Sequence, residues 1–246
     1  MRNIKLTIEY DGTDYCGWQT QNATGAKSIQ QLIEEALIKV FQKKTALIGS
    51  GRTDSGVHAC NQTANFKTDS QLSPGKIRSA LNSYLPKDIA IKMVREVDGD
   101  FHARFRVKSK IYRYSILNAA VPSPFNRRYA LFIPYLLDLE KMKKAATYLK
   151  GRHNFKSFHR ARGKQKRFVR TIKKLEVVRR NGIVCVGIEA EGFLYHMVRI
   201  IVGTLLEVGR GRFRPGYMKE ILRQKNRKLA GPTLPGRGLC LMEVKY

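Results

Sequence analysis

Residues 49–60 read GSGRTDSGVHAC, and they place three glycines, an arginine, an aspartate and a histidine in one predicted turn. Glycine permits a positive φ or a close approach of another molecule, and Asp54 and Ser55 are residue types common in turns. Two interpretations follow from these residues alone. The segment is an ordinary connecting loop, or it presents the Asp54 carboxylate to a ligand.

The residues around this loop predict alternating strands and helices. Alternating apolar side chains over residues 4–8 predict a strand that runs into a turn. An apolar stripe at helical spacing over residues 29–41, with Ser28 as N-cap, predicts a helix. Ser73 and Pro74 mark the start of a second helix. Further strands are predicted in the segments TALIGSG and QTANFKT, on either side of the loop.

The second part of the chain repeats this plan loosely. Asp138 caps a predicted helix, and Asn181-Gly182 is the strongest hairpin signal in the chain. Two more helices are predicted over residues 193–209 and 215–224, followed by a closing strand at residues 238–246. The whole pattern predicts an α+β protein. We place a boundary near residue 105, which gives an N-terminal half (1–105) and a C-terminal half (106–246).

Composition indicates a polyanionic partner. The 246 residues include 47 Lys and Arg but 19 Asp and Glu, a formal net charge of +28. The sequence has neither the roughly 18 consecutive apolar residues of a membrane span nor an N-terminal secretory segment, so we predict a cytoplasmic protein. The four cysteines form no C-x-x-C pair, which argues against a zinc site or a disulfide framework. We expect reduced thiols, several of them buried.

The positive charge is concentrated in two segments. Residues 141–175 contain fourteen Lys and Arg and no acidic residue, interleaved with His and Phe. The simplest interpretation of this charge is a solvated surface. However, a surface that serves only solubility usually mixes positive and negative side chains. Aromatic rings among cations suit stacking on splayed RNA bases better than reading a DNA groove. The second segment contains Arg210, Arg212, Arg214, Lys219, Arg223, Lys225, Arg227 and Lys228.

Several catalytic classes lack their motifs here. The chain has no P-loop, no dinucleotide-binding glycine motif, no H-E-x-x-H and no G-x-S-x-G. A metal-dependent nuclease usually needs several carboxylates, and none clusters beside Asp54 in the sequence.

Six motifs, in this order, resemble the TruA family of tRNA pseudouridine synthases. The resemblance covers nearly the whole chain. It implies the pseudouridine-synthase fold, two α+β halves with mixed, mainly antiparallel sheets forming a central cleft. The motifs are YDGTDYCGWQTQ, SIQQLIEEAL, GRTDSGVHA, DFHARF followed by KIYRYSI, FLYHMVRIIVGTLLEVGRG, and AGPTLPGRGL.

The resemblance implies isomerisation of uridine to pseudouridine in the anticodon stem-loop of tRNA, at positions 38, 39 and 40, by a homodimer without cofactor or metal. Asp54 is then the catalytic carboxylate, and Arg52 helps to drive the target base out of its stack. Tyr112 stacks on the flipped uracil, and Arg199 pairs with Asp54. An ionised carboxylate serves as a nucleophile or removes a proton, and the sequence leaves both routes open.

Each assignment has a simpler alternative. Asp54 is otherwise a turn residue, and Arg52 a phosphate ligand. Tyr112 and Tyr114 share one face of a strand, so the choice of Tyr112 depends on the family. We expect His58 to be structural. For tRNA contact we predict Arg162, Lys164, Lys166 and Arg167.

The main rival to an enzyme is a noncatalytic RNA-binding protein, which the charge alone permits. Release of tritium from C5 of uracil in tRNA distinguishes the two, because only the isomerisation expels that hydrogen.

Overall fold

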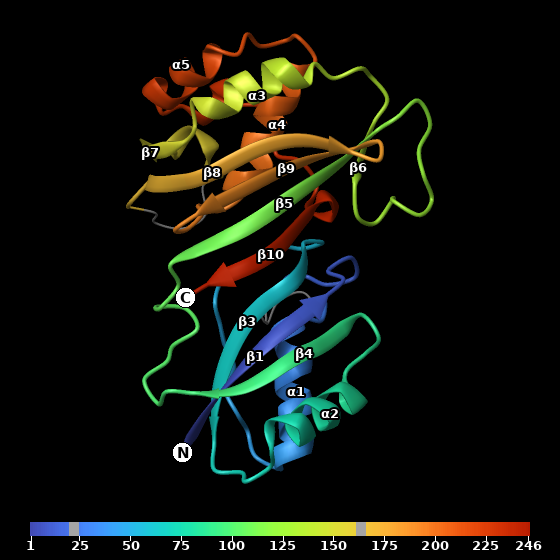
Figure 1. The fold of residues 1–246 in the computed structure, drawn as a ribbon, viewed down its shortest axis with the longest axis vertical. Helices are drawn as coiled ribbons and strands as arrows, with labels where there is room; N and C mark the ends of the chain where they lie inside the picture. The colour runs from blue at the N-terminus through green and yellow to red at the C-terminus, as the bar shows by residue number, and fades with distance from the viewer. Residues whose placement is uncertain (20–24, 161–165) are drawn as a thin grey trace. The chain divides into compact units, whose positions relative to one another are not determined.

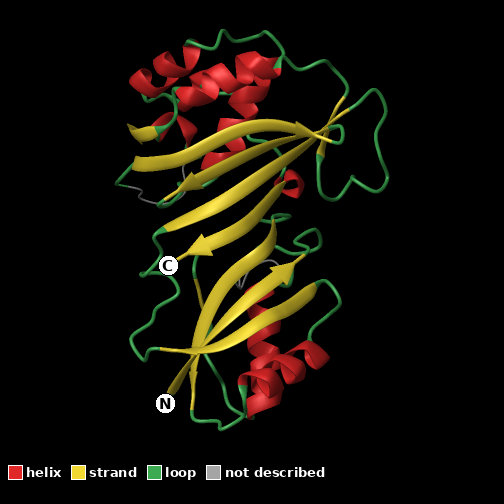
Figure 2. Cartoon of the chain, in the orientation of Figure 1, coloured by secondary structure: helices red, strands yellow, loops and turns green. Residues whose placement is uncertain are grey.

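The chain folds into two compact units. The computed structural model describes residues 1–19, 25–160 and 166–246. The first unit contains residues 1–108 together with 240–246, and the second contains residues 109–239. Both units combine helices with a sheet, as Figure 2 shows by colour. The predicted α+β class is confirmed.

A mainly antiparallel sheet forms the first unit. Its order is β4-β1-β3-β10, with β2 beside β3. All pairs are antiparallel except β10 with β3, which is parallel through Cys240 opposite His58 and Leu241 opposite Ala59. The elements are β1 (Arg2–Tyr10), α1 (Ile29–Phe41), β2 (Ile48–Gly49), β3 (His58–Thr68), α2 (Pro74–Tyr84), β4 (Ile89–Val97) and β10 (Leu239–Lys245).

The first unit differs from the predicted N-terminal half at both ends of the second unit. We placed residues 106–246 together, whereas residues 106–108 and, as the larger difference, residues 240–246 belong with the first unit. The reason for the larger difference is the pairing of β10 with β3, a contact between segments far apart in the chain.

Two helices cover one face of this sheet (Figure 1). Ser28 caps α1 by accepting a hydrogen bond from the Gln31 amide, and Ser73 caps α2 in the same way. Pro74 occupies the first position of α2, where its missing N–H is tolerated. These caps confirm the predicted helix starts. Apolar side chains of β1 and α1 supply the core, among them Ile4, Leu6, Ile8, Ile29, Ile33 and Leu37, all fully buried.

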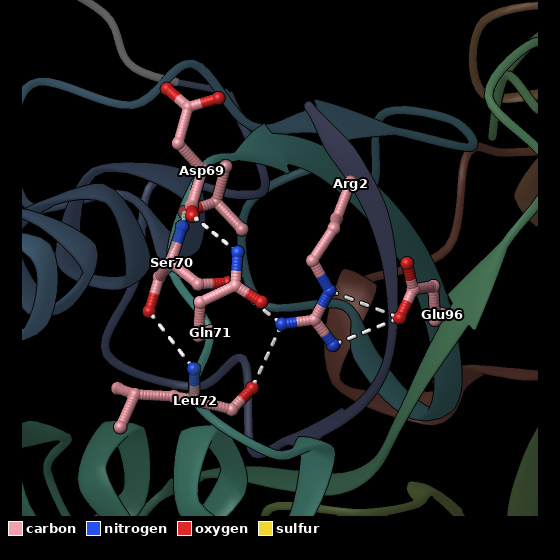
Figure 3. A network of polar contacts seen from close by, with 7 residues as sticks. Arg2, Asp69, Ser70, Gln71, Leu72 and Glu96 are labelled. Carbon is pink, nitrogen blue, oxygen red and sulfur yellow. Dashed lines mark hydrogen bonds and ion pairs between the residues drawn. The ribbon is translucent and has the colours of Figure 1, made fainter.

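One arginine connects three segments of the first unit (Figure 3). Arg2 of β1 donates two hydrogen bonds to a carboxylate oxygen of Glu96 on β4, at 3.0 and 2.9 Å. A third nitrogen donates to the main-chain oxygens of Ser70 and Leu72, at 2.7 and 3.0 Å. Arg2 therefore ties the connection between β3 and α2 to the edge of the sheet.

The second unit also forms a mainly antiparallel sheet. Its order is β5-β9-β8-β7, with β6 parallel to β5. The strands β8 and β9 are joined at Asn181-Gly182, where both residues have positive φ, as the hairpin prediction requires. The elements are β5 (Ser109–Asn118), β6 (Leu131–Ile133), α3 (Leu139–Thr147), β7 (Gly151–Asn154), β8 (Val169–Arg180), β9 (Ile183–Ala190), α4 (Met197–Gly209) and α5 (Tyr217–Gln224).

Helices α3 and α4 pack together over one side of this sheet (Figure 1). We predicted a helix from residue 193, but α4 begins at Met197 because His196 has a positive φ of 61°. Almost all of α4 is buried, and Gly203 lies against the backbone at Pro232. No helix among the described residues is long and apolar enough to cross a membrane.

Three strands were not predicted from the sequence, and the burial of the cysteines was predicted wrongly. Strand β4 was overlooked because its alternation is interrupted at Lys92 and Met93, which are both exposed where the register with β1 shifts. Strands β6 and β7 have only 3 and 4 residues. None of the four cysteines forms a disulfide, but all four are half-buried, so the expectation that several are buried was wrong.

Candidate active site and RNA-binding surface

Asp54 lies in the connection between two paired strands. We call residues 50–57, between β2 and β3, the Asp54 loop. A tight turn forms at its end, where the Val57 amide donates to the Asp54 carbonyl at 3.2 Å and Gly56 has a φ of 72°. The turn leaves Asp54 half-buried and Arg52 exposed. The loop therefore holds one carboxylate and one guanidinium within three residues of each other.

Buried polar groups of β3 support the start of the Asp54 loop. The Gln62 side chain, fully buried, accepts from the Ser50 hydroxyl at 2.6 Å and donates to the Gly51 carbonyl at 3.0 Å. The Ser50 amide donates to the Thr63 carbonyl at 2.8 Å. Because buried polar groups must be paired, these bonds fix the backbone of the loop.

A second segment, residues 10–18, holds the far part of the loop, and we call it the anchoring segment. The Trp18 amide donates to the Thr53 carbonyl at 3.1 Å. The Tyr15 carbonyl accepts from the Ser55 hydroxyl at 3.1 Å and from the Gly56 amide at 3.4 Å. The loop is therefore bonded on both sides of Asp54.

Two glycines allow the anchoring segment to approach this closely. A Cβ atom on Gly12 would lie 2.0 Å from the Val57 carbonyl oxygen. A Cβ on Gly17, whose φ is 109°, would lie 2.5 Å from the Thr53 oxygen. No larger residue fits at either position without moving backbone.

His58 has a structural role, as we expected. It is 5% exposed, and its Nδ1 accepts a hydrogen bond from the Gly12 amide at 3.0 Å. The same nitrogen lies 3.1 Å from a carboxylate oxygen of Asp11. His58 therefore holds the turn that begins the anchoring segment.

The two predicted catalytic residues of the second unit lie on β5 and α4. Tyr112 is 7% exposed and meets the Phe193 ring edge-on, with centroids 5.1 Å apart. Arg199 is half-buried, and its Nε donates to the Leu234 carbonyl at 2.6 Å. That bond ties the first turn of α4 to the segment before β10.

Tyr114, the alternative to Tyr112, is committed to the core. It is fully buried, and its hydroxyl donates to the Pro235 carbonyl at 2.9 Å. Burial raises the pKa of Tyr114, while the positive charges of Arg199 and Arg237 act in the opposite direction. Arg237 was not among the predicted site residues, although it lies in the quoted motif AGPTLPGRGL.

A basic hollow of about 690 Å³ lies beside the edge strand β7. Of the predicted RNA-binding residues, Lys166 and Arg167 line it; Arg162 and Lys164 lie outside the described residues. Arg152 and Arg170 add two more cations, against one carboxylate, that of Glu191.

Arg170 is one of two cations of this hollow, with Arg152, that the sequence did not single out. Its Nη1 donates to the carbonyls of Val169 and Arg167, at 2.7 and 3.2 Å. These bonds fix the guanidinium in place. Burial lowers the pKa of Arg170 from its usual value, yet an arginine remains charged at neutral pH. A fixed cation of this kind suits a phosphate oxygen.

The second basic segment divides into structural and exposed cations. Arg210 and Arg212 both pair with the buried Glu207, at 3.3 and 3.2 Å. Arg227 donates to the Ala230 carbonyl and the Thr233 hydroxyl, both at 3.1 Å. Arg210 and Arg227, both half-buried, therefore stabilise the fold, whereas Arg212 is exposed. Arg214, Lys219, Arg223, Lys225 and Lys228 are exposed.

Two of these exposed cations line a second hollow, of about 430 Å³, with Tyr148, the residue directly after α3, and with residues of β7. Lys219 and Arg223 come from α5, and the Lys219 ammonium lies 4.6 Å from the Tyr148 ring centroid. None of the described residues that line this hollow is acidic. Asn154 of β7 lines both hollows, so basic surface lies on both sides of this strand.

Comparison with known proteins identifies one family. The model of a family described as tRNA pseudouridine synthase matches residues 6–106 and 145–246. A Clostridium perfringens protein named tRNA pseudouridine synthase A 2 is 49% identical over 246 residues, 100% of both chains. The tRNA pseudouridine synthase A of Acetivibrio thermocellus is 48% identical, again over 100% of both. A chain in a crystal structure of a Cbf5-Nop10-Gar1 complex aligns at a TM-score of 0.32 with 13% identity, over 92% of this chain and 69% of that one. This last likeness is too weak to be used.

Proposed function

We propose that this chain acts on uridines in the anticodon stem-loop of tRNA, at positions 38, 39 and 40. The chain belongs to the tRNA pseudouridine synthase family and is therefore an isomerase that acts on uridine in tRNA. The relatives named tRNA pseudouridine synthase A support tRNA as the substrate. The motif resemblance supports the choice of arm. The observation that carries the chemistry is the set of hydrogen bonds that fixes the Asp54 loop on both sides of Asp54.

The reaction needs only atoms already present in the uridine. The bond between C1′ of the ribose and N1 of uracil breaks, the base rotates, and C1′ bonds to C5. The C5 hydrogen leaves as a proton, and N1 gains one. The target base must leave its stack before any of this happens, since its atoms are otherwise out of reach.

We assign the catalytic roles as follows. Asp54 supplies the carboxylate that acts at the ribose or at the ring. Arg52, exposed in the same loop, helps to displace the base from its stack. Tyr112 stacks on the displaced uracil, and Arg199 pairs with Asp54 to keep the carboxylate ionised. The first unit thus supplies the catalytic loop.

The second unit supplies the tRNA-binding surface in this proposal. Lys166 and Arg167, with Arg170 beside them, bind phosphates at the larger hollow. Arg162 and Lys164, which lie outside the described residues, are also proposed to bind phosphates. Lys219 and Arg223 bind phosphates at the smaller hollow. The support is the excess of cations around both hollows and the polyanionic nature of RNA.

We also propose that the enzyme is a homodimer that works in the cytoplasm. Residues 121–136 expose large apolar side chains, with Val121 70%, Phe125 92% and Leu136 92% accessible. Large apolar side chains exposed along one segment favour an interface there. Replacing both Phe125 and Leu136 by Glu is expected to convert a dimer into a monomer in light scattering. A monomeric wild type contradicts the dimer.

Replacing Asp54 by Asn tests the catalytic assignment. We expect tritium release from tRNA labelled at uracil C5 to fall by at least about 10³-fold. Binding of tRNA stays nearly intact, because a carboxylate contributes no attraction for phosphate. Asp98→Asn, which neutralises an exposed carboxylate of the same unit, is the matched control.

Two results contradict this proposal. An Asp54→Asn enzyme that still releases tritium removes Asp54 from the chemistry. Release from uridines outside the anticodon stem-loop, mapped by testing tRNAs with single labelled positions, removes the proposed target.

A further inference from the structure

Thr53, the residue immediately before Asp54, is fixed through both its side chain and its main chain. Its hydroxyl lies 2.8 Å from the Tyr10 hydroxyl, and the two groups share a hydrogen bond. Its carbonyl accepts from the Trp18 amide at 3.1 Å. Tyr10 and Thr53 are only 3% and 6% exposed. Water therefore cannot replace this bond if one partner is removed.

Tyr10 is itself held in one position. It is the last residue of β1, where it pairs with Ala59 of β3 and with Ile89 of β4. Its ring lies against the Trp18 ring, with centroids 6.2 Å apart. Burial raises the pKa of Tyr10, so its hydroxyl stays protonated and available for hydrogen bonding at neutral pH.

Trp18 completes this arrangement from the other end of the anchoring segment. Its indole lies so close to Gly49 that a Cβ there would be 2.5 Å from the indole nitrogen. Gly49 is the last residue of β2, directly before the Asp54 loop. The anchoring segment therefore contacts the loop where it begins and again at Thr53.

We propose that the Tyr10–Thr53 hydroxyl pair positions Asp54 for the isomerisation, as a positioning pair that does not touch the uridine. The proposal rests on the proposed function, in which Asp54 is the catalytic carboxylate. Asp54 is joined to Thr53 by one peptide bond, so a shift of Thr53 moves the carboxylate. A misplacement of about 1 Å is enough to slow a reaction by about 100-fold.

Ser55, on the other side of Asp54, provides a contrast. Its hydroxyl donates to the Tyr15 carbonyl at 3.1 Å, but the residue is exposed. Water can take the place of an exposed hydroxyl, and the Gly56 amide continues to donate to the same carbonyl. The pairing at Ser55 therefore contributes little to the position of Asp54.

The test compares variants that keep or remove one hydroxyl. Thr53→Val keeps the shape of the side chain but removes the hydroxyl, and Thr53→Ser keeps the hydroxyl. We expect Thr53→Val and Tyr10→Phe to lower the single-turnover rate of tritium release by about 10- to 100-fold. Thr53→Ser and Ser55→Ala stay within about threefold of wild type. The Kd for tRNA changes by less than about twofold in all four, because none removes a cation.

The double variant Tyr10→Phe/Thr53→Val separates positioning from general destabilisation. If the two residues act through their shared hydrogen bond, the rate loss of the double variant is smaller than the product of the two single losses, although Tyr10→Phe also removes a hydrogen bond to Gln62. Rates that multiply, or a Kd for tRNA that weakens as much as the rate falls, overturn the proposal. A wild-type rate in Thr53→Val overturns it as well. Thermal unfolding of each variant confirms that the rates are measured on folded protein.

Asp54→Asn, measured beside these variants, distinguishes the catalytic role of Asp54 from the positioning role of Tyr10 and Thr53. An active Asp54→Asn enzyme overturns the catalytic assignment and this proposal with it. An inactive Asp54→Asn enzyme together with a fully active Thr53→Val enzyme overturns the positioning role alone.

Discussion

Replacing Gly12 by alanine gives the sharpest perturbation of the Asp54 loop that leaves every polar group in place. The new Cβ would lie 2.0 Å from the Val57 carbonyl oxygen and 2.6 Å from the Val57 carbonyl carbon. Real Cβ atoms stay at least 3.0 Å from such atoms, so the backbones must separate by about 3.0 − 2.0 = 1.0 Å. Both atoms belong to backbone, so a rotamer change cannot relieve the clash.

This displacement reaches Asp54 through the turn. The Val57 amide donates to the Asp54 carbonyl, so the two residues move together. A shift of about 1 Å predicts a loss of about 100-fold in the single-turnover rate. Overpacking of this kind also destabilises by about 1 to 3 kcal/mol. For a chain of this size that corresponds to a fall in Tm of about 2 to 12 °C.

The assay measures tritium release, the Kd for tRNA and Tm for Gly12→Ala and for one matched control. Gly75→Ala is the control, since Gly75 is exposed near the start of α2 and a Cβ there meets nothing within 4 Å. We expect wild-type activity in the control and unchanged Kd in both variants. If Gly12→Ala reacts and melts like wild type, the close packing against Val57 does not position Asp54.

Two further predictions concern the second unit. Changing both Lys166 and Arg167 to Ala should weaken tRNA binding. The slope of log K against log salt concentration should become shallower by up to about 0.7 to 0.9 per lost phosphate contact. An unchanged slope in titrations at several salt concentrations removes these residues from the interface. Burial and the charge of Arg170 lower the pKa of His159 below its usual value of 6.5, so the unfolded chain binds a proton first as the pH falls. Stability contributed by neutral His159 is therefore complete above pH 6.5 and declines below it, and His159→Gln should flatten this decline in urea titrations.

Local signals in the sequence predicted most helices and the hairpin. Ser28, Ser73 and Asp138 each act through bonds within their own helix, so their roles can be read from neighbouring residues. Asn181-Gly182 works in the same way. Strand β4 was overlooked because strands depend on partners elsewhere in the chain. In addition, the alternation of buried and exposed residues along β4 is interrupted at Lys92 and Met93.

The candidate site was predictable in part, because some of its signals also lie close together in the sequence. The glycines and Asp54 mark a functional loop within twelve residues, and the motif resemblance supplied the family that the comparisons confirm. The support of the loop was not predictable. Tyr10 lies 43 positions before Thr53, and no local pattern signals their contact. Arg210 was counted with the RNA-binding charge because its ion pair with the buried Glu207 becomes evident only when α4 and the turn after it are formed.

The return of β10 to the first unit has a consequence for biosynthesis. Strand β3 leaves the ribosome long before β10, and the whole second unit is made between them. Until Cys240 and Leu241 emerge, one edge of β3 beside His58 lacks its neighbour. A nascent chain therefore holds an unfinished sheet next to the Asp54 loop, and closing it has to overcome the entropy of a very long intervening segment. Premature termination anywhere in the second unit removes the strand that borders the loop, although every residue of the loop itself has already been made.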